Sequence, residues 1–158
     1  MGRPLAAYLG AASRVGDLTP TLTRMTIAEA QEMLLGLMAT DMLQLRSGVP
    51  RILRALALGS AGRGRRRLRY IRRDRNETWL NLRDIWAKGG GDCEDLAAGV
   101  AAEFNVFAGV PSRPVIVRVR PGLAHAVVEI LDTGEIVDPS RIGGMGEGRE
   151  VLRARRHV

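Results

Sequence analysis

The chain is poor in residues on which many small proteins depend. Its single cysteine, Cys93, has no partner for an internal disulfide, so folding does not require an oxidising compartment. Aromatic residues make up only 4% of the 158 residues, and the core must therefore consist mainly of Leu, Val, Ile, Ala and Met. The chain has two histidines, His125 and His157, and neither stands near Cys93 at a spacing typical of zinc ligands, so no zinc site is expected.

Long apolar runs are also missing. The most apolar stretch, residues 33–45, is interrupted by Asp41 and is too short to span a bilayer. The N-terminal sequence MGRPLAAYLGAASRVG contains an early Arg and no sustained apolar segment, which argues against a signal peptide. We therefore expect a soluble protein without a membrane span, and nothing in the sequence calls for a metal or another cofactor.

The residues that are present suffice for one domain with a modest core and an extension. Apolar residues make up 46%, which excludes a largely disordered chain. Residues 1–24 are rich in Gly, Ala, Thr and Pro without a clear period and indicate an extended arm. After the arm we expect a helical segment with an Arg-rich linker over 25–75, a compact core over 76–142, and a Gly-rich loop with a basic tail over 143–158.

The first helix has a clear start signal. Thr26 and Glu29 form the pattern of a capping box, in which the hydroxyl accepts from a free backbone N–H and the carboxylate binds back. A helix is therefore predicted over 27–46, ended by Ser47-Gly48. Pro50 can serve as the first residue of a second, shorter helix, because its missing N–H is not needed there. The side chains predicted on the inner face of the first helix are Ile27, Ala30, Leu34, Leu37, Met38, Asp41 and Leu45.

Arginine is the one abundant charged residue. The net charge is +7, and most of that excess lies between residues 59 and 79. Guanidinium groups bind phosphate and carboxylate through two hydrogen bonds at once, so this segment can bind an anion, a nucleic acid or another protein. It can equally be a solvated linker, and no aromatic residues alternate with the arginines as on base-stacking surfaces. The candidate anion- or partner-binding residues are Arg63, Arg65, Arg66, Arg67, Arg69, Arg72 and Arg73.

The second half of the chain carries patterns of both helices and strands. Apolar residues recur at helical spacing from Trp79 to Trp86, and the glycine run that follows would end this short helix. A longer helix is predicted from Cys93 to Phe107, ended by Gly109. Its inner face would hold Leu96, Val100, Phe104 and Phe107.

Three stretches with strand character come next. Residues 115–120, 125–130 and 135–138 are rich in β-branched residues, and a turn is predicted at 132–134. The predicted fold class is therefore α+β. In this fold a helix that opens with Cys93 packs on a small antiparallel sheet, and helices and an arm precede it.

Three residues with complementary chemistry stand in order along this segment. Cys93 opens a helix after three glycines and an aspartate, His125 begins a strand, and Asp138 ends the next strand. Free N–H groups at a helix N-terminus stabilise a thiolate and an oxyanion, and the glycines would let a substrate backbone come close. His125 could take the thiol proton and return it to the leaving group. Asp138 could fix the tautomer of the imidazole and favour its charged form.

The segments GGGDCEDLA, AHAVVEI and VDPS together resemble the transglutaminase-like branch of the papain-like cysteine enzymes. That family places Gly-x-Cys at the start of a helix, His on a strand and Asp on the next strand. The resemblance covers about residues 76–142 and implies that Cys93 is the nucleophile, His125 the base and Asp138 the orienting acid. In the particular residues of these motifs and of the Trp-containing segment before them, the sequence is most similar to small proteins encoded by tailed bacteriophages and prophages.

The resemblance implies a cysteine-dependent acyl-transfer enzyme, either an amide hydrolase or peptidase or a transglutaminase-like enzyme. Its substrate would be a peptide, a peptidoglycan cross-bridge or a protein side chain. The phage likeness implies an alternative, a structural or assembly protein of a tailed-phage particle, with other protein subunits as partners and the virion or the host cytoplasm as its location. Members of the family often complete the oxyanion hole with an upstream aromatic or amide side chain, for which Trp79, Asn81 and Trp86 are the candidates.

Two features argue against an active site. Glu94 and Asp95 suit the positive end of the helix dipole but would raise the pKa of a neighbouring thiol, unless they bind Arg side chains instead. In addition, a tight turn between the last two strands would place a residue near Arg141 opposite His125. Asp138 would then need a β-bulge or a longer loop to reach the imidazole.

Each candidate residue also has an ordinary structural interpretation. Cys93 could be a small buried apolar side chain, as most unpaired cysteines are. A lone histidine on a strand is commonly structural, and Asp138 with Pro139 could simply end a strand. Trp79 and Trp86 could belong to the core. The sequence therefore leaves a catalytic and a structural role open for this segment.

Overall fold

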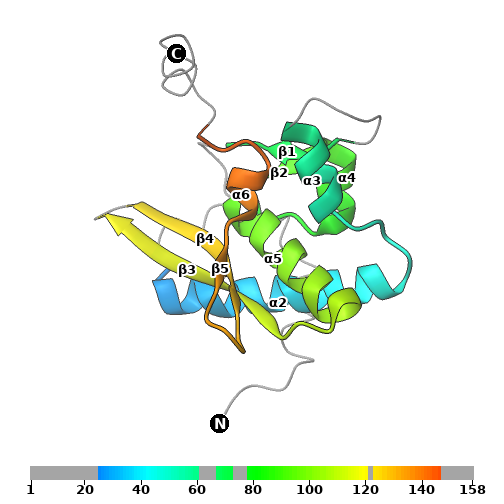
Figure 1. Ribbon diagram of the computed structural model, residues 1–158. Helices are drawn as coiled ribbons and strands as arrows, with labels where there is room; N and C mark the ends of the chain where they lie inside the picture. The colour runs from blue at the N-terminus through cyan, green and yellow to red at the C-terminus, as the bar shows by residue number, and fades with distance from the viewer. Residues whose placement is uncertain (1–24, 61–66, 73–77, 121–122, 147–158) are drawn as a thin grey trace.

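A computed structural model of the chain describes residues 25–60, 67–72, 78–120 and 123–146 (Figure 1). Within these residues the fold is α+β, with helices packed against small sheets, as the sequence predicted. The predicted arm at 1–24, most of the basic tail and five arginines of the Arg-rich segment lie outside the described residues. Those arginines are Arg63, Arg65, Arg66, Arg73 and Arg75.

Helix α2, Ile27–Arg46, confirms the predicted helix and its capping box. The Glu29 N–H donates to Thr26 Oγ1 at 3.2 Å, and the Thr26 N–H donates to Glu29 Oε2 at 2.8 Å. Ser47 forms the C-terminal cap, as predicted. The predicted inner face is buried at Leu34, Leu37, Asp41 and Leu45, whereas Ile27 is exposed.

Helix α3, Leu53–Ser60, begins three residues later than the predicted start at Pro50. A carboxylate from a distant helix sets this start, because Glu103 Oε2 accepts hydrogen bonds from the N–H groups of Ile52 at 2.9 Å and Leu53 at 3.0 Å. Pro50 instead offers its carbonyl to the indole N–H of Trp86 at 2.8 Å. The prediction of Pro50 as a first helical residue was therefore wrong.

Helices α4, Leu82–Lys88, and α5, Cys93–Glu103, confirm the two helices predicted around the glycine run. Gly89 ends α4 with φ 77°, a conformation that glycine adopts without strain. A π-helical turn, η3 (Phe104–Ala108), continues α5 before Gly109 ends it. This turn rotates Phe107 out of the predicted inner face, and its ring lies 3.7 Å from the Arg51 guanidinium.

Helix α5 runs through the middle of the molecule and packs against the larger sheet and against helices α2 and α4 (Figure 1). Its small residues allow this close packing. A Cβ atom on Gly99 would lie 2.7 Å from Ile52 Cδ1 and 2.9 Å from Leu82 Cδ2. The α5 side chains without any exposed surface are Leu96, Ala97, Ala98, Val100, Ala101 and Ala102, together with Asp95.

The main sheet is antiparallel with the order β3-β4-β5. Its strands are β3 (Ser112–Arg120), β4 (Leu123–Ile130) and the short β5 (Ile136–Val137), close to the predicted ranges. Helix α2 covers part of the outer edge of β3, where Gln31 donates to the Pro114 carbonyl at 2.7 Å and accepts from the Ile116 N–H at 3.0 Å. A short helix, α6 (Pro139–Ile142), follows β5 and was not predicted.

A second, two-stranded sheet was also not predicted. Strand β1, Arg69–Tyr70, pairs in parallel with β2, Gly90–Gly91. Part of the segment interpreted as an Arg-rich linker is therefore built into the fold, next to the glycines that precede Cys93. The strands have two residues each, too short to produce a detectable alternation in sequence.

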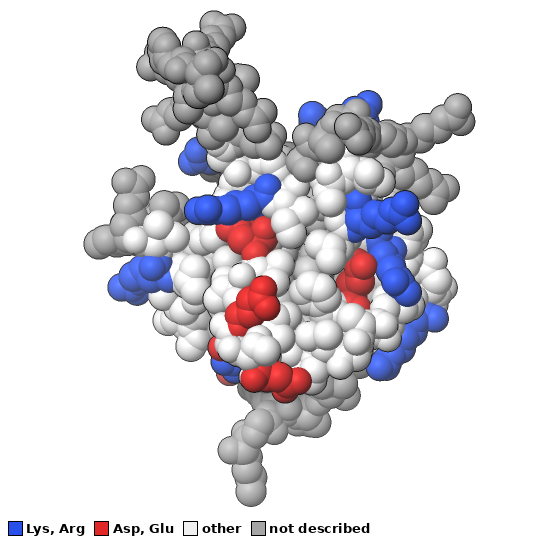
Figure 2. All heavy atoms as spheres, in the orientation of Figure 1, with Lys and Arg blue, Asp and Glu red and all other residues white. Residues whose placement is uncertain are grey.

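Charged side chains are distributed over the surface in both signs. Figure 2 shows Lys and Arg mainly around the rim of one face, with Asp and Glu nearer its middle. On this face, the described residues do not gather the positive charge into one area. Within the ranges that the structure describes, no helix combines the length and the apolar content needed to cross a membrane.

Candidate active site

The candidate site begins at the N-terminus of α5. Asp92 caps this helix, because its side chain accepts from the Asp95 N–H at 3.3 Å while Asp95 Oδ2 accepts from the Asp92 N–H at 3.2 Å. Asp95 Oδ1 also accepts from the Leu80 N–H at 2.5 Å. The Asp95 carboxylate thus ties the chain before α4 to the start of α5 and fixes the place at which Cys93 emerges.

The glycines before Cys93 are required by the protein's own chain. A Cβ atom on Gly90 would lie 2.0 Å from the Arg69 carbonyl oxygen, and one on Gly91 would lie 2.7 Å from Asp95 Cβ. The space beside these two glycines is therefore occupied by β1 and by Asp95. We had predicted that the glycines make room for a substrate backbone, and for Gly90 and Gly91 this was wrong.

His125 and Asp138 contact each other directly. His125 Nε2 lies 3.0 Å from Asp138 Oδ2, with 16% and 20% of the two side chains exposed. No β-bulge is needed, because the register of β4 and β5 places Asp138 diagonally across from His125 on the same face of the sheet. The prediction that Asp138 needs a bulge or a longer loop was wrong, since it considered only directly opposite residues.

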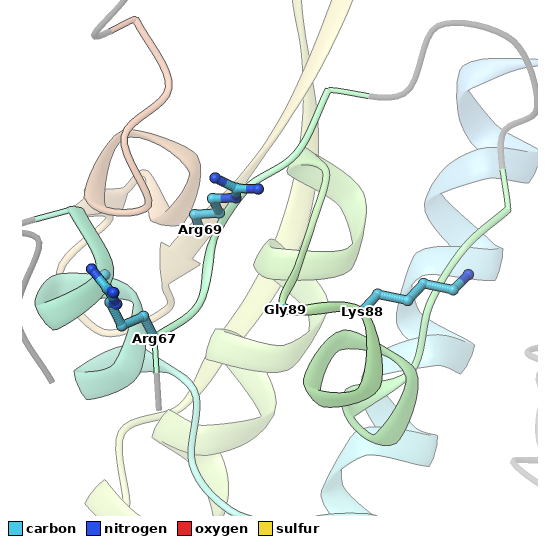
Figure 3. A pocket seen from close by; sticks show the side chains of 5 residues that line it. Arg67, Arg69, Lys88 and Gly89 are labelled. Atoms are coloured by element: carbon cyan, nitrogen blue, oxygen red, sulfur yellow. The ribbon is translucent and has the colours of Figure 1, made fainter. Parts of the chain in front are cut away.

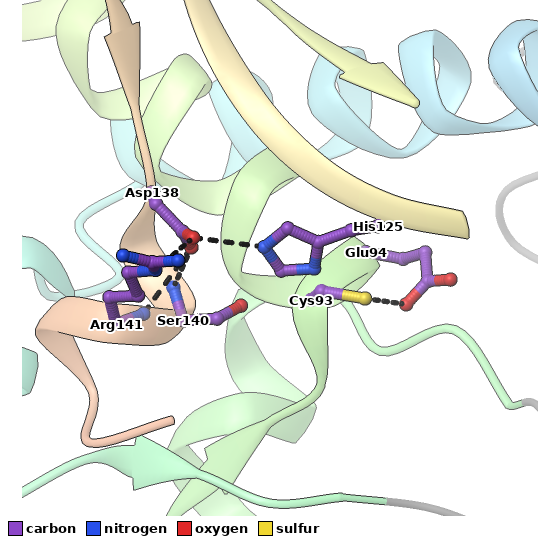
Figure 4. Close-up of polar contacts among 6 residues, drawn as sticks. All are labelled: Cys93, Glu94, His125, Asp138, Ser140 and Arg141. Carbon is purple, nitrogen blue, oxygen red and sulfur yellow. Dashed lines mark hydrogen bonds and ion pairs between the residues drawn. The ribbon is translucent and has the colours of Figure 1, made fainter. Parts of the chain in front are cut away.

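Asp138 is held in place from its other side by α6. Its Oδ1 accepts from the N–H groups of Ser140 at 3.1 Å and Arg141 at 3.3 Å, so Asp138 is the N-cap of this helix. The Arg141 guanidinium also lies 3.4 Å from Asp138 Oδ2 (Figure 4). The carboxylate therefore has a fixed orientation toward His125, and Pro139 as the first helical residue explains the Asp-Pro sequence.

The Cys93 sulfur lies against the edge of β4. The Ile130 N–H donates to the Glu135 carbonyl, so alternate N–H groups of β4 point toward β5. Strand β5 ends opposite Val128, and the next N–H on this side, that of Ala126, forms a hydrogen bond with Cys93 instead. In Figure 4 the His125 ring lies between Asp138 and Cys93, with Nε2 toward Asp138 and the other ring nitrogen on the side of the sulfur.

The surroundings of Cys93 favour its protonated thiol over the thiolate. Burial raises the pKa of Cys93 well above its ordinary value, and the charge of Glu94 raises it further. The Cys93 thiol donates a hydrogen bond to Glu94 Oε2 at 2.9 Å (Figure 4). The hydrogen bond from the Ala126 N–H lowers the pKa of Cys93, but by less than burial and Glu94 raise it. The expected lowering of the thiol pKa by the helix N-terminus is therefore overturned by burial and by Glu94.

Glu94 itself has an unusual environment. Burial and then the charge of Asp92 raise the pKa of Glu94 to about 7. The predicted effect of the first-turn acids on the thiol is thus confirmed for Glu94, whereas Asp95 binds the backbone N–H groups described above. Tyr70, from β1, faces the same group of acids: burial, and then the charges that Cys93, Asp92 and Glu94 carry when ionised, raise the pKa of Tyr70 to about 12.

The three residues proposed for the oxyanion hole have structural contacts in this structure. Trp79 is a buried member of the core. Asn81 is the N-cap of α4, and its side-chain oxygen accepts from the N–H groups of Arg83 and Asp84. Trp86 donates its indole N–H to the Pro50 carbonyl. These contacts give each of the three a role in holding the fold.

A pocket of about 410 Å³ lies beside the described part of the Arg-rich segment and is lined by Gly59, Arg67, Arg69, Lys88 and Gly89 (Figure 3). Lys88 was not predicted here. Gly59 and Lys88 belong to the C-terminal turns of α3 and α4, whose carbonyl groups carry partial negative charge. In Figure 3 the Lys88 side chain also points away from the arginines. The pocket is therefore less favourable for binding an anion than its three cationic lining residues would suggest.

Comparisons with protein-family models, with curated proteins and with solved structures returned no match for this chain.

Proposed function

We propose that the chain is a cysteine-dependent acyl-transfer enzyme with Cys93 as nucleophile, His125 as general base and Asp138 as the orienting acid. The observation that supports this most directly is the 3.0 Å contact between His125 Nε2 and Asp138 Oδ2 beside the N-terminus of α5. A proton on Nε2 that is donated to Asp138 leaves the lone pair on Nδ1, the ring nitrogen on the side of the Cys93 sulfur (Figure 4).

The proposed reaction has two steps. In the first, His125 Nδ1 takes the thiol proton, the sulfur bonds to the carbonyl carbon of an amide, and the C–N bond breaks as the imidazolium returns the proton to the leaving amine. A thioester on Cys93 remains. In the second step water or another amine attacks the thioester, His125 removes the proton of the attacking group, and the sulfur leaves as the thiol.

Negative charge on the carbonyl oxygen needs donors close to the sulfur. The N–H groups of the first turn of a helix have no partner within the helix, and at the start of α5 these include the N–H of Cys93 itself. The positive end of the helix dipole acts at the same place. A peptide, a peptidoglycan cross-bridge or a protein side chain with an amide group has the chemistry that this reaction requires.

Acetylation by p-nitrophenyl acetate tests this proposal without knowledge of the natural substrate. Release of p-nitrophenolate is measured at pH 7, and peptide mass spectrometry locates the acetyl group. We expect acetylation of Cys93 in the wild type and none at this position in Cys93→Ala. We expect His125→Ala to lower the acylation rate by about 100-fold or more, the usual contribution of a general base.

His157→Ala is the matched control, because it removes the second histidine of the chain and leaves His125 in place. This variant should react like the wild type. Circular dichroism establishes that the variants are folded. Equal acylation rates in folded His125→Ala and in the wild type would contradict the proposal and favour the alternative, a structural protein of an assembly that keeps the fold without the reaction.

A further inference from the structure

The contact between Cys93 and Glu94 has no place in the reaction described above. The thiol donates to Glu94 Oε2 at 2.9 Å, so the hydrogen of the nucleophile points toward a carboxylate and is not free for the imidazole (Figure 4). Both side chains are partly buried at the N-terminus of α5. A neighbouring carboxylate in such a position accepts the thiol hydrogen and opposes the negative charge of a thiolate.

We propose that Glu94 is a fourth residue of the site, which keeps the Cys93 thiol protonated while its own carboxylate is charged and releases the sulfur to His125 when that carboxylate takes up a proton. This inference rests on the proposed function, since a release of the sulfur matters only if it acts as a nucleophile. The near-neutral pKa of Glu94 places the change at about pH 7, within the physiological range.

The groups around Glu94 support a proton as the event that releases the thiol. On its own segment the neighbours are Asp92 and Cys93, and β1 contributes Tyr70, a phenol that stays neutral at physiological pH. On the β4 side stands His125, whose Nε2 is bound to Asp138. Arg72, which follows β1, is a cation whose charge lowers the pKa of Tyr70. Burial and the neighbouring Asp92 carboxylate favour the uptake of a proton by Glu94, whereas the hydrogen bond from the Cys93 thiol opposes it.

The proposal predicts a characteristic pH dependence of thiol reactivity. As long as the pH is below the pKa of an isolated thiol, its thiolate fraction rises about tenfold for each unit by which the pH rises. In the wild type, however, Glu94 loses its proton near pH 7 and the resulting charge raises the pKa of Cys93. The thiolate fraction therefore stops rising at about pH 7 and resumes its rise only at higher pH. Glu94→Gln has no such charge, and its thiolate fraction continues to rise.

The rate of Cys93 alkylation by iodoacetamide between pH 5 and pH 10 measures this directly and does not depend on acyl transfer. We expect the wild type and Glu94→Gln to react at similar rates at pH 5 to 6. Above pH 7 the two rates should separate by about tenfold per pH unit, the factor that one pKa unit represents. The same separation should appear in the acetylation rate if the proposed function holds.

Glu135→Gln is the matched control, because Glu135 is an exposed glutamate in the turn before β5, away from α5. Its alkylation curve should coincide with that of the wild type. Three results would overturn the role of Glu94: parallel curves for the wild type and Glu94→Gln, a slower reaction of Glu94→Gln at every pH, or a plateau that persists in Glu94→Gln and disappears in His125→Ala. Separation in alkylation without any acetylation would overturn the proposed function alone.

Discussion

Asp41 makes the stability of this protein depend on pH in a direction opposite to that of most carboxylates. Its side chain is fully buried in α2, and burial raises the pKa of Asp41 well above its ordinary value of 3.8. Oδ1 accepts from the Leu82 N–H at 2.9 Å, whereas Oδ2 has no hydrogen-bond partner among the described residues. The charge of Asp84 raises the pKa further. The folded protein therefore holds a proton on Asp41 that the unfolded chain gives up.

The sign and size of the effect follow from this difference. Below about pH 4 the carboxyl is protonated in both states, and its contribution to the free energy of unfolding is fully present. As the pH rises through the window between the unfolded and the folded pKa, Asp41 lowers the free energy of unfolding by about 1.4 kcal/mol per pH unit. Asn in place of Asp41 keeps an acceptor for Leu82 but cannot ionise. Asp41→Asn should therefore match the wild type near pH 4 and exceed it by a growing margin from pH 5 upward.

Urea unfolding followed by circular dichroism at pH 4, 5, 6 and 7 measures this margin, and other ionisable groups cancel in the comparison. Glu32→Gln is the control, because Glu32 is exposed on the same helix, and its difference from the wild type should not change with pH. Asp41→Ala should be less stable than Asp41→Asn at every pH by about 1–3 kcal/mol, since the buried Leu82 N–H loses its acceptor. A constant difference between Asp41→Asn and the wild type from pH 4 to pH 7 would refute the assignment of a buried, protonated Asp41.

Two further predictions concern the packing that positions the site. Glu103→Ala should lower the free energy of unfolding, measured in urea, by about 2–4 kcal/mol, because α3 loses the only N-terminal acceptor described for it. Glu103→Gln keeps one acceptor oxygen and should lower it by about half as much or less. Equal losses in the two variants would show that the carboxylate does not cap α3. Gly91→Ala should lower the free energy of unfolding by about 1–3 kcal/mol and change the alkylation rate of Cys93, because its Cβ would displace Asp95. In Gly89→Ala the new Cβ meets open space, so this variant should lose about 1 kcal/mol and keep the alkylation rate of the wild type. Equal alkylation rates in both glycine variants would contradict the role of Asp95 in placing Cys93.

The elements that could be predicted from the sequence are those with local signals. The capping box at Thr26, the glycine that ends α4 and the β-branched stretches each act within a few residues, and the structure has all of them. The start of α3 could not be predicted, because Glu103, which sets it, lies 51 residues from Ile52 in the sequence. The same applies to β1 and β2, whose partners are distant from each other and only two residues long.

The candidate site was predictable as a set of residues but not as a geometry. The motif around Cys93, His125 and Asp138 indicated which side chains to examine, and the structure brings His125 and Asp138 together. Which first-turn acid acts on the thiol could not be read from the sequence, because Glu94 and Asp95 are adjacent and chemically alike. The backbone separates them: Asp95 points inward to the Leu80 N–H, and Glu94 remains beside the sulfur.

Strand β1 has a consequence for how the site is completed during folding. The N–H groups of β1 and of the next residue, Ile71, bind both to the glycine run before Cys93 and to the end of α6: Arg69 donates to Gly89, Ile71 to Gly91 and Tyr70 to Gly143. Three consecutive residues thus join the segment that carries the nucleophile to the segment that carries Asp138. These hydrogen bonds join residues that are far apart in the sequence, so they can form only after the chain has closed the loops between them. A chain cleaved or strained next to β1 would keep its helices and its hairpin and yet lose the alignment between the two halves of the site.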